Sequence, residues 1–331
     1  MQTSPGFRVL FILLIATCFA CPAAGQDTAE TIRIESDLVD LKVSVLGLAS
    51  AAQPLLLGQK DFSVLEDGAP QEIAFFAAAD APFDLVLLLD LSGSSAKKLK
   101  LIRRSAKRFV DAARPVDRIA IVTFTDQPSL VSNFTWNREL LKERIDAISD
   151  AVGGTNFWDS LNYVLGDLVP QNHGLRRTAV VVMTDGIDNA LPDVNGPGSR
   201  ISFSDLLRNV ERSEAIVFPI YLDTEAEDVT RFHVPRAAYV EARAQLTQIS
   251  SVCGTSLYRA AKLKDLDQSY AQVIRDLSMV YSIGYRPTNR GLDGKWRTVE
   301  VKLPGRPELF ARTKRGYFAR QDSEQTNAPP N

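Results

Sequence analysis

The sequence predicts an α/β protein: a doubly wound, mostly parallel sheet with helices on both faces, flanked by a small antiparallel β domain built from N- and C-terminal segments. Three observations support this prediction. Near-continuous apolar runs recur through the middle of the chain, which is typical of strands covered on both faces. Stretches with apolar residues at helical spacing lie between these runs. Toward both ends of the chain, apolar and polar residues alternate, as in half-buried strands.

The N-terminus, residues 1–25, is expected to be a secretory signal peptide. Arg8 precedes a short apolar run over 9–16, and small residues follow up to Gly25, where we expect cleavage. This pattern predicts a secreted or periplasmic protein. A retained anchor is one alternative, and a lipid anchor on Cys21 is another, although the preceding residues fit a lipoprotein cleavage site poorly. No later segment is long and apolar enough to cross a bilayer.

Residues 26–80 are expected to form an N-terminal β segment. The stretches 31–35 and 41–45 alternate apolar and polar residues, which suits half-buried antiparallel strands. Two later apolar runs are separated by Asp67 and Gly68, a pair that favours a tight turn between strands. The segment is too short to close a stable sandwich by itself.

The central residues, 81–277, are expected to form the α/β domain. Its buried strands are predicted where the apolar runs are nearly continuous, over 85–89, 119–124, 179–183 and 215–221. Six helices are predicted by apolar periodicity, over about 95–113, after a capping Asn137, and around 157–165, 206–210, 244–249 and 266–277. Strand and helix alternate along the chain, which predicts a doubly wound fold.

Alternation of apolar and polar residues returns in residues 278–320, the expected C-terminal β segment. We expect this segment to pair with 26–80, so that the α/β domain is an insertion whose two ends lie close together. The last residues, 321–331, are polar with prolines near the end and are expected to be disordered.

Charge and cysteine content exclude some classes of protein. The 38 Lys and Arg residues nearly balance the 40 Asp and Glu residues, and the net charge of -2 gives no electrostatic reason to expect a nucleic-acid partner. Once the signal peptide is removed, Cys253 is the remaining cysteine. No intrachain disulfide can then form, and we expect a buried structural thiol.

Oxygen-bearing side chains follow two of the predicted strands. Asp90 ends the first strand of the α/β domain, and Ser92 and Ser94 follow it in a tight turn. Asp185 ends a later strand, and Thr155 follows two glycines before a helix. Ligands bind to open α/β sheets outside the carboxyl ends of the strands. Two carboxylates and three hydroxyls form an all-oxygen ligand set, which favours Mg²⁺ first, with Mn²⁺ or Ca²⁺ possible.

The order of these residues resembles the metal-ion-dependent adhesion site of von Willebrand factor A domains. The matching motifs are D-x-S-x-S after the first strand, a threonine in G-G-T, and T-D-G after a later core strand. The resemblance implies that Ser92, Ser94 and Thr155 contact the metal, whereas Asp90 and Asp185 act directly or through water.

The resemblance extends over about residues 81–277. In the flanks, residues 61–68 and 316–319 are similar to a family of bacterial secreted proteins related to these domains. Two departures concern the rim of the site and therefore the partner. The loop over 191–199 is longer than expected after T-D-G, and a polar insert spans about 224–236.

Other readings of the motif are a capped helix and a phosphate-binding loop. The turn with Asp90, Ser92 and Ser94 would by itself also suit a helix cap, but Thr155 and Asp185 in the expected order favour a metal site. A phosphate-binding loop would need G-x-x-x-x-G-K, which is absent.

Further polar residues follow the same strands. Asp126, Asp188 and Asn189 lie near the expected site. We expect them to support its loops.

The resemblance implies a secreted, non-enzymatic binding or adhesion module without catalytic residues. An acidic side chain of a partner protein would complete the coordination of the metal, and loops around 125–135, 153–157 and 187–199 would supply specificity. One alternative is a metal-dependent hydrolase, in which Asp90, Asp185 and the metal activate water, although no other catalytic motif accompanies them. A structural domain with a vestigial metal site is a further alternative.

Overall fold

The computed structural model describes most of the chain between residues 38 and 320. The described residues are 38–47, 57–92, 99–149, 153–171, 176–223, 225, 234–261 and 263–320. The expected signal peptide, the strand expected at 31–35 and the C-terminal tail lie outside them. Within the described residues, no helix has the length and apolar character needed to span a membrane.

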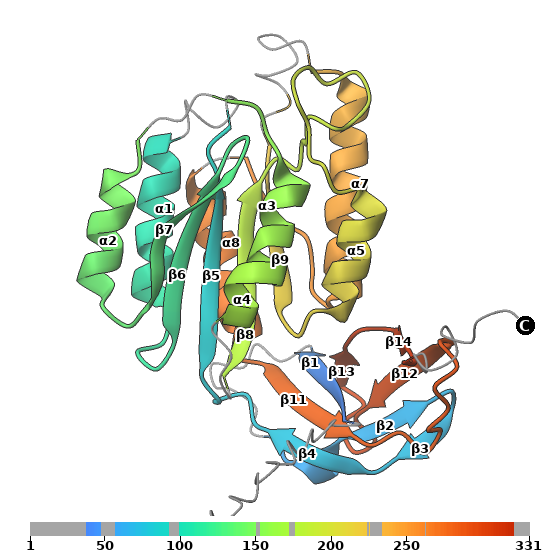
Figure 1. Ribbon diagram of the computed structural model, residues 1–331. Coiled ribbons are helices and arrows are strands. Elements are labelled where there is room, and N and C mark those ends of the chain that lie inside the picture. The colour runs from blue at the N-terminus through green and yellow to red at the C-terminus, as the bar shows by residue number, and fades with distance from the viewer. Residues whose placement is uncertain are drawn as a thin grey trace, which may run out of the picture. The chain divides into compact units, whose positions relative to one another are not determined.

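A six-stranded sheet forms the α/β part of the molecule (Figure 1), with the strand order β10-β9-β8-β5-β6-β7. In chain order the strands are β5 (Phe83–Asp90), β6 (Arg118–Phe124), β7 (Pro128–Thr135), β8 (Arg177–Thr184), β9 (Ile216–Leu222) and β10 (Tyr258–Ala260). Neighbouring strands are parallel except for β6 and β7. The predicted doubly wound, mostly parallel sheet is therefore confirmed.

Two strands of this sheet were not predicted. The expectation of a loop over 125–135 is wrong for most of that range, because Pro128–Thr135 forms β7. This strand lies at the sheet edge and is only partly buried, so it lacks the continuous apolar run that marks the central strands. Strand β10 has only three residues, too few for a periodic pattern.

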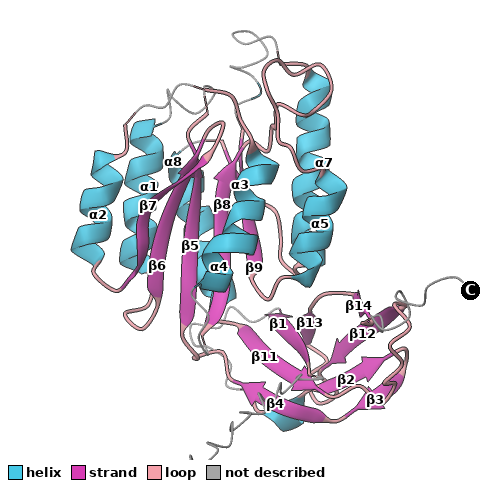
Figure 2. Cartoon of the chain, in the orientation of Figure 1, coloured by secondary structure: helices cyan, strands magenta, loops and turns pink. Residues whose placement is uncertain are grey.

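Helices cover both faces of the sheet (Figure 2). Their bounds are α1 (Leu99–Ala112), α2 (Arg138–Ala147), α3 (Phe157–Tyr163), α4 (Val169–Gln171), α5 (Phe203–Arg212), α7 (Arg236–Val252) and α8 (Leu263–Leu277), with a π-helical segment, Val164–Leu168, joining α3 to α4. The predicted cap of α2 is confirmed, because the side chain of Asn137 accepts a hydrogen bond of 3.0 Å from the amide of Leu140.

Alternation of side chains along β5 explains the two helical layers. Leu85, Leu87 and Leu89 belong to a buried cluster with residues of α1, α2 and α8. Val86 and Leu88 belong to a second cluster with residues of α3, α5 and α7. Successive side chains of a strand point to opposite faces, so an apolar strand buries both.

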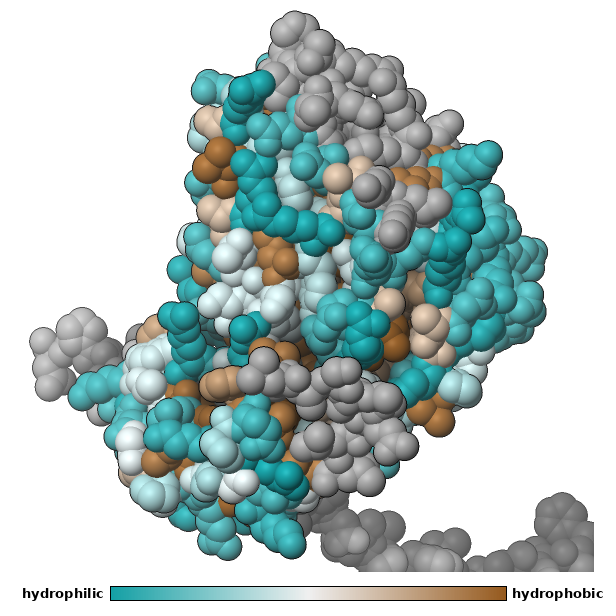
Figure 3. Space-filling view, turned by 180° about the vertical axis from the view of Figure 1, so that it is seen from behind, coloured by the Kyte–Doolittle hydropathy of each residue, from teal (hydrophilic) through white to brown (hydrophobic). Residues whose placement is uncertain are grey.

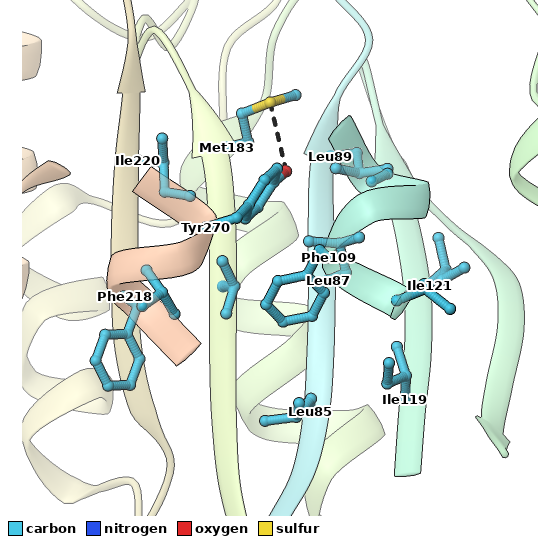
Figure 4. Close-up of a cluster of buried hydrophobic side chains, with 14 of the residues drawn as sticks. Leu85, Leu87, Leu89, Phe109, Ile119, Ile121, Met183, Phe218, Ile220 and Tyr270 are labelled. Atoms are coloured by element: carbon cyan, nitrogen blue, oxygen red, sulfur yellow. Dashed lines mark hydrogen bonds between the residues drawn. The ribbon is translucent and has the colours of Figure 1, made fainter. Parts of the chain in front are cut away.

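Aromatic rings pack among the aliphatic side chains of the first of these clusters (Figure 4). The ring centroids of Phe109 on α1 and Tyr270 on α8 lie 5.2 Å apart. The Tyr270 hydroxyl donates to the sulfur of Met183 on β8, 3.7 Å away. Burial of each such side chain stabilises the fold by roughly 1.5–3 kcal/mol, so this layer fixes the helices on the sheet.

Two four-stranded antiparallel sheets combine the N- and C-terminal segments, with the orders β13-β1-β11-β4 and β14-β12-β2-β3. Their strands are β1 (Val39–Gly47), β2 (Ser63–Glu66), β3 (Ala69–Gln71), β4 (Ile73–Ala77), β11 (Val280–Tyr285), β12 (Trp296–Lys302), β13 (Leu309–Arg312) and β14 (Gly316–Phe318), and a short helix spans Gln59–Asp61. The expected pairing of the two segments is confirmed by β1 with β11 and by β2 with β12. The domain boundaries expected at residues 80 and 278 stay predictions.

The predicted turn between β2 and β3 has a specific backbone conformation. Asp67 and Gly68 have φ angles of 48° and 81°, in the left-handed region that glycine and aspartate tolerate best.

The preceding Glu66 is buried and accepts hydrogen bonds of 2.7 and 2.8 Å from the hydroxyls of Tyr285 and Tyr317. A carboxylate from one segment is thus held by two residues of the other.

The surface is mixed in character. Viewed from behind, hydrophilic side chains cover most of the visible face, and hydrophobic ones form small separate patches among them (Figure 3). Small scattered patches are normal for a folded protein surface.

Candidate metal site

Asp90 is the last residue of β5, and its side chain is fully buried. One carboxylate oxygen, Oδ1, accepts a hydrogen bond of 2.9 Å from the amide of Ser92. The other, Oδ2, accepts a hydrogen bond of 2.6 Å from the hydroxyl of Thr184. These two contacts fix the orientation of the carboxylate at the end of the sheet.

Asp185 directly follows β8 and is also buried. Its Oδ1 accepts a hydrogen bond of 3.0 Å from the amide of Ile187. Strands β5 and β8 are parallel neighbours with Leu89 opposite Met183. The carboxylates of Asp90, at the end of β5, and of Asp185, directly after β8, therefore lie at one edge of the sheet. The chain order reverses between these strands, which is where open α/β sheets bind ligands.

Burial and the nearby charge of Asp185 both change the acidity of Asp90. Burial raises the pKa of Asp90 to about 7, and the negative charge of Asp185 adds to the increase. The hydrogen bonds from Thr184 and Ser92 partly oppose it. Two buried carboxylates that repel each other favour either a bound proton or a nearby cation.

Thr155, the predicted hydroxyl ligand, is buried in a loop before α3. Its amide donates to the side-chain oxygen of Asn189 at 3.2 Å, and its carbonyl accepts from the amide of Asn189 at 2.9 Å. This reciprocal pair joins the loop that carries Thr155 to the loop that follows Asp185. The expected supporting role of Asn189 is therefore visible as two direct contacts.

The same loop is held from its other side by the residues that follow β6. Asp126 accepts a hydrogen bond of 2.7 Å from the amide of Gly154, and its carbonyl accepts one of 2.9 Å from the Asn156 side chain. The amide of Asn156 in turn donates to the carbonyl of Thr125 at 2.9 Å. Asp126 therefore contacts the residues on both sides of Thr155, the backbone of Gly154 and the side chain of Asn156.

Asp188, fully buried, holds the start of α3 and the long loop after T-D-G. Its Oδ2 accepts from the amide of Trp158 at 2.9 Å and from the hydroxyl of Ser199 at 2.6 Å. Its Oδ1 accepts from the amides of Ala190 and Ser199 at 2.8 and 3.0 Å. A carboxylate at the N-terminus of a helix is also stabilised by the helix dipole.

Four of the five predicted ligands are therefore found at the same edge of the sheet. Asp90, Ser92, Thr155 and Asp185 are buried at the carboxyl edge of the sheet, whereas Ser94 lies outside the described residues. Thr184, which contacts Asp90 directly, was not among the site residues predicted from the sequence. Its position as the last residue of β8, in T-D-G, was the available signal.

The chemistry of this donor set suits a hard divalent cation. In the described part of the chain, no group of three or more His, Cys, Asp or Glu side chains is arranged to hold a metal ion. Two carboxylates with neighbouring hydroxyls offer only oxygen, which suits Mg²⁺, Mn²⁺ and Ca²⁺ better than softer metals. The buried repulsion at Asp90 is the kind that such a cation relieves.

Solved structures with similar folds include several bacterial proteins. BatB from Bacteroides thetaiotaomicron is 15% identical, with a TM-score of 0.44 over 59% of this chain and 98% of that one. The von Willebrand factor domain of the type V pilus tip protein Mfa5 from Porphyromonas gingivalis is 14% identical, with a TM-score of 0.44 over 59% and 94%. Proximal thread matrix protein 1 from the mussel byssus, with a zinc-occupied adhesion-site motif, is 16% identical, with a TM-score of 0.47 over 63% and 48%.

Sequence comparison gives the family assignment. No curated protein matches the sequence. The family model for the von Willebrand factor type A domain matches residues 84–272, which is more than half of the 331 residues. The matched range contains almost all of the six-stranded sheet, the helices that cover it up to part of α8, and the candidate metal site. The chain therefore belongs to the von Willebrand factor type A domain family.

Proposed function

We propose that this protein is a non-enzymatic module that binds a partner protein outside the cytoplasm through a divalent cation. Domains of this family are commonly metal-dependent adhesion modules. The observation that carries the proposal is the pair of buried carboxylates, Asp90 and Asp185, at the ends of two neighbouring parallel strands. Burial is the main cause of the raised pKa of Asp90, and the negative charge of Asp185 adds to it; a bound cation would offset both effects.

The proposed ligands are Asp90, Ser92, Ser94, Thr155 and Asp185. A bound Mg²⁺, or Mn²⁺ or Ca²⁺, would neutralise the carboxylates and offer a coordination position to a carboxylate of the partner. The side chains around the site also contribute to binding of the partner. They hold the carboxylates and hydroxyls in place before the partner arrives, which lowers the entropic cost of association.

The metal is tested by thermal unfolding with and without Mg²⁺. At a concentration of 100 times the dissociation constant, a bound ion stabilises the folded state by about 2.7 kcal/mol, which raises the melting temperature by about 5 °C in a protein of this size. We expect this increase in the wild type but not in Asp185→Asn or Thr155→Ala. Asp167→Asn, an exposed control, should respond like the wild type. Equal melting of the wild type with and without Mg²⁺ would contradict the proposed site.

Partner binding is tested by immobilising the protein and washing with either Mg²⁺ or EDTA. We expect an extracytoplasmic protein to be retained in Mg²⁺ and released by EDTA, and not to be retained by Asp185→Asn. Its binding site should contain an acidic residue whose conversion to the amide abolishes retention. Retention that is equal in Mg²⁺ and EDTA would show that the metal is not part of the interface.

The proposed location outside the cytoplasm has its own test. Export by the N-terminal segment predicts that the mature protein begins close to Gln26. N-terminal sequencing of the protein recovered from periplasmic and medium fractions measures this directly. Recovery only from the cytoplasm, with Met1 at the N-terminus, would refute export.

A further inference from the structure

A pocket of about 410 Å³ borders the turn that follows β5, where two of the proposed metal ligands lie. Leu91, which sits between Asp90 and Ser92, forms part of its wall. The amide of Leu91 donates a hydrogen bond of 2.9 Å to the carbonyl of Phe124, another wall residue. The pocket is therefore continuous with the turn that carries two of the proposed ligands.

The walls of the pocket come from the turn between β6 and β7 and from the end of α2. Apolar contacts are provided by Leu91, Phe124, Val131, Ala147 and Ile148. The remaining wall residues carry a hydroxyl, an amide or a guanidinium, and they are Thr123, Thr125, Gln127, Ser129, Arg144 and Ser149. About half of the wall residues are thus able to donate a hydrogen bond to a ligand.

These polar side chains have no partners elsewhere in the described structure. No side-chain hydrogen bond or ion pair joins any of the six to another described residue. Arg144 lies in the last turn of α2 and is exposed, and no Asp or Glu is among the described wall residues. An apolar occupant would separate these donors from water without replacing their hydrogen bonds, which is unfavourable.

We infer that this pocket binds a second carboxylate of the partner segment whose first carboxylate completes the metal site, and that Arg144 pairs with it. The inference rests on the proposed function. It assigns the partner as an acidic segment with two carboxylates, one recognised by the cation and one by the guanidinium. Hydroxyl donors of Thr125, Ser129 and Ser149 add hydrogen bonds around the second carboxylate. Arginine is suited to this role because its planar fork pairs with both carboxylate oxygens.

Linear dicarboxylates from succinate to sebacate test this inference, with monocarboxylates of the same chain lengths as references. Each is titrated into the full protein at a fixed free Mg²⁺ concentration, and dissociation constants are taken from chemical shifts of backbone amides. We expect one range of chain lengths to bind at least about tenfold more tightly than the matched monocarboxylate, the gain that one charge-assisted hydrogen bond gives. A linker of matching length makes the second contact intramolecular.

Two variants identify the source of the gain. Arg144→Gln should lose the tenfold advantage of the dicarboxylate and keep Mg²⁺-dependent binding of the monocarboxylate. Arg208→Gln removes an exposed arginine on α5, outside the pocket, and should bind like the wild type.

The possible outcomes separate the two proposals. Monocarboxylate binding that needs Mg²⁺, without any dicarboxylate advantage, would refute the pocket and leave the proposed function intact. Affinity that rises with alkyl chain length and does not depend on Arg144 would show that the pocket binds an apolar group. That result would also refute the binding of a second carboxylate there. Absence of any Mg²⁺-dependent carboxylate binding would refute the proposed function and, with it, this inference.

Discussion

The hydroxyl of Thr184 donates a hydrogen bond of 2.6 Å to Oδ2 of Asp90. The two residues end neighbouring strands, β8 and β5, and are 94 positions apart in the chain. The same hydroxyl accepts a hydrogen bond of 2.9 Å from the amide of Gly186. Thr184 thus connects the carboxylate of one strand to the turn that presents Asp185.

Replacement of this hydroxyl should weaken metal binding without removing a ligand. In Thr184→Val the side chain keeps its shape, but Asp90 and the amide of Gly186 each lose a hydrogen bond. We expect the Mg²⁺ dissociation constant to rise about 10- to 100-fold, as it does when partners of metal ligands are removed, measured by calorimetric titration. Thr178→Val, on the same strand without a side-chain hydrogen bond to a described residue, is the matched control. Equal affinity of Thr184→Val and Thr178→Val would show that this contact does not orient the site.

The loop that carries Thr155 should tolerate no side chain at Gly154. A Cβ atom there would lie 2.2 Å from Nδ2 of Asn189 and 2.7 Å from Oδ1 of Asp126. Both residues hold the loop by hydrogen bonds, so moving them displaces Thr155. We expect Gly154→Ala to weaken Mg²⁺ binding at least about tenfold.

Gly166→Ala is the control for this substitution. A Cβ atom at Gly166 meets nothing within 4 Å, and the residue is in a helical segment. Alanine there should leave Mg²⁺ affinity unchanged and stabilise the fold by about 0.5–1 kcal/mol. If both variants bound Mg²⁺ like the wild type, Mg²⁺ binding would not depend on the observed position of the loop that carries Thr155.

Arg177 should be important for stability rather than for binding. Its buried guanidinium donates to the carbonyls of Ala79, Ala81 and Val280, and it lies 4.0 Å from the ring centroid of Phe83. These carbonyls belong to the segment that enters β5 and to the start of β11. Removal of the guanidinium leaves them without that donor, so Arg177→Ala should lower the free energy of unfolding by about 3 kcal/mol or more, measured by denaturant titration.

Lysine at position 177 tests whether charge or geometry matters. Arg177→Lys keeps the charge but has no planar fork, so it should recover only a small part of the loss. Arg208→Ala, on the exposed surface of α5, should change stability by less than about 0.5 kcal/mol. Full recovery of stability in Arg177→Lys would contradict the role assigned to the planar guanidinium group.

Cys253 should react slowly with thiol reagents in the folded protein. The structure shows Cys253 as partly buried rather than fully buried as expected, yet burial of the thiol raises its pKa to about 12, so far fewer molecules carry a thiolate at pH 8 than at the ordinary pKa of about 8.5. We expect iodoacetamide to label the peptide containing Cys253 at least about 100-fold faster in urea than in buffer. Because the shift is upward, the rate in the folded protein should keep rising with pH well above 9. Similar rates in urea and in buffer would indicate an accessible, unperturbed thiol.

Much of the fold was predictable because its signals are local in sequence. The apolar runs that include Leu85–Leu89 and Ala179–Met183 indicate strands buried on both faces, and the amphipathic stretches between them indicate helices. Strand β7 was missed because an edge strand is half exposed and alternates irregularly. Its polar residues were therefore interpreted as a loop.

The sequence by itself determined the family resemblance and the types of ligand at the candidate site, because Asp90, Ser92, Ser94, Thr155 and Asp185 occur in a motif whose order can be read along the chain. Only the tertiary structure decided which other residues surround these ligands. The contact of Thr184 with Asp90, the support of the Thr155 loop, and the donor-lined pocket beside Leu91 each join segments that are far apart in sequence. Such contacts depend on the order of the strands in the sheet, which brings distant side chains to one edge, and no local pattern of residues encodes it.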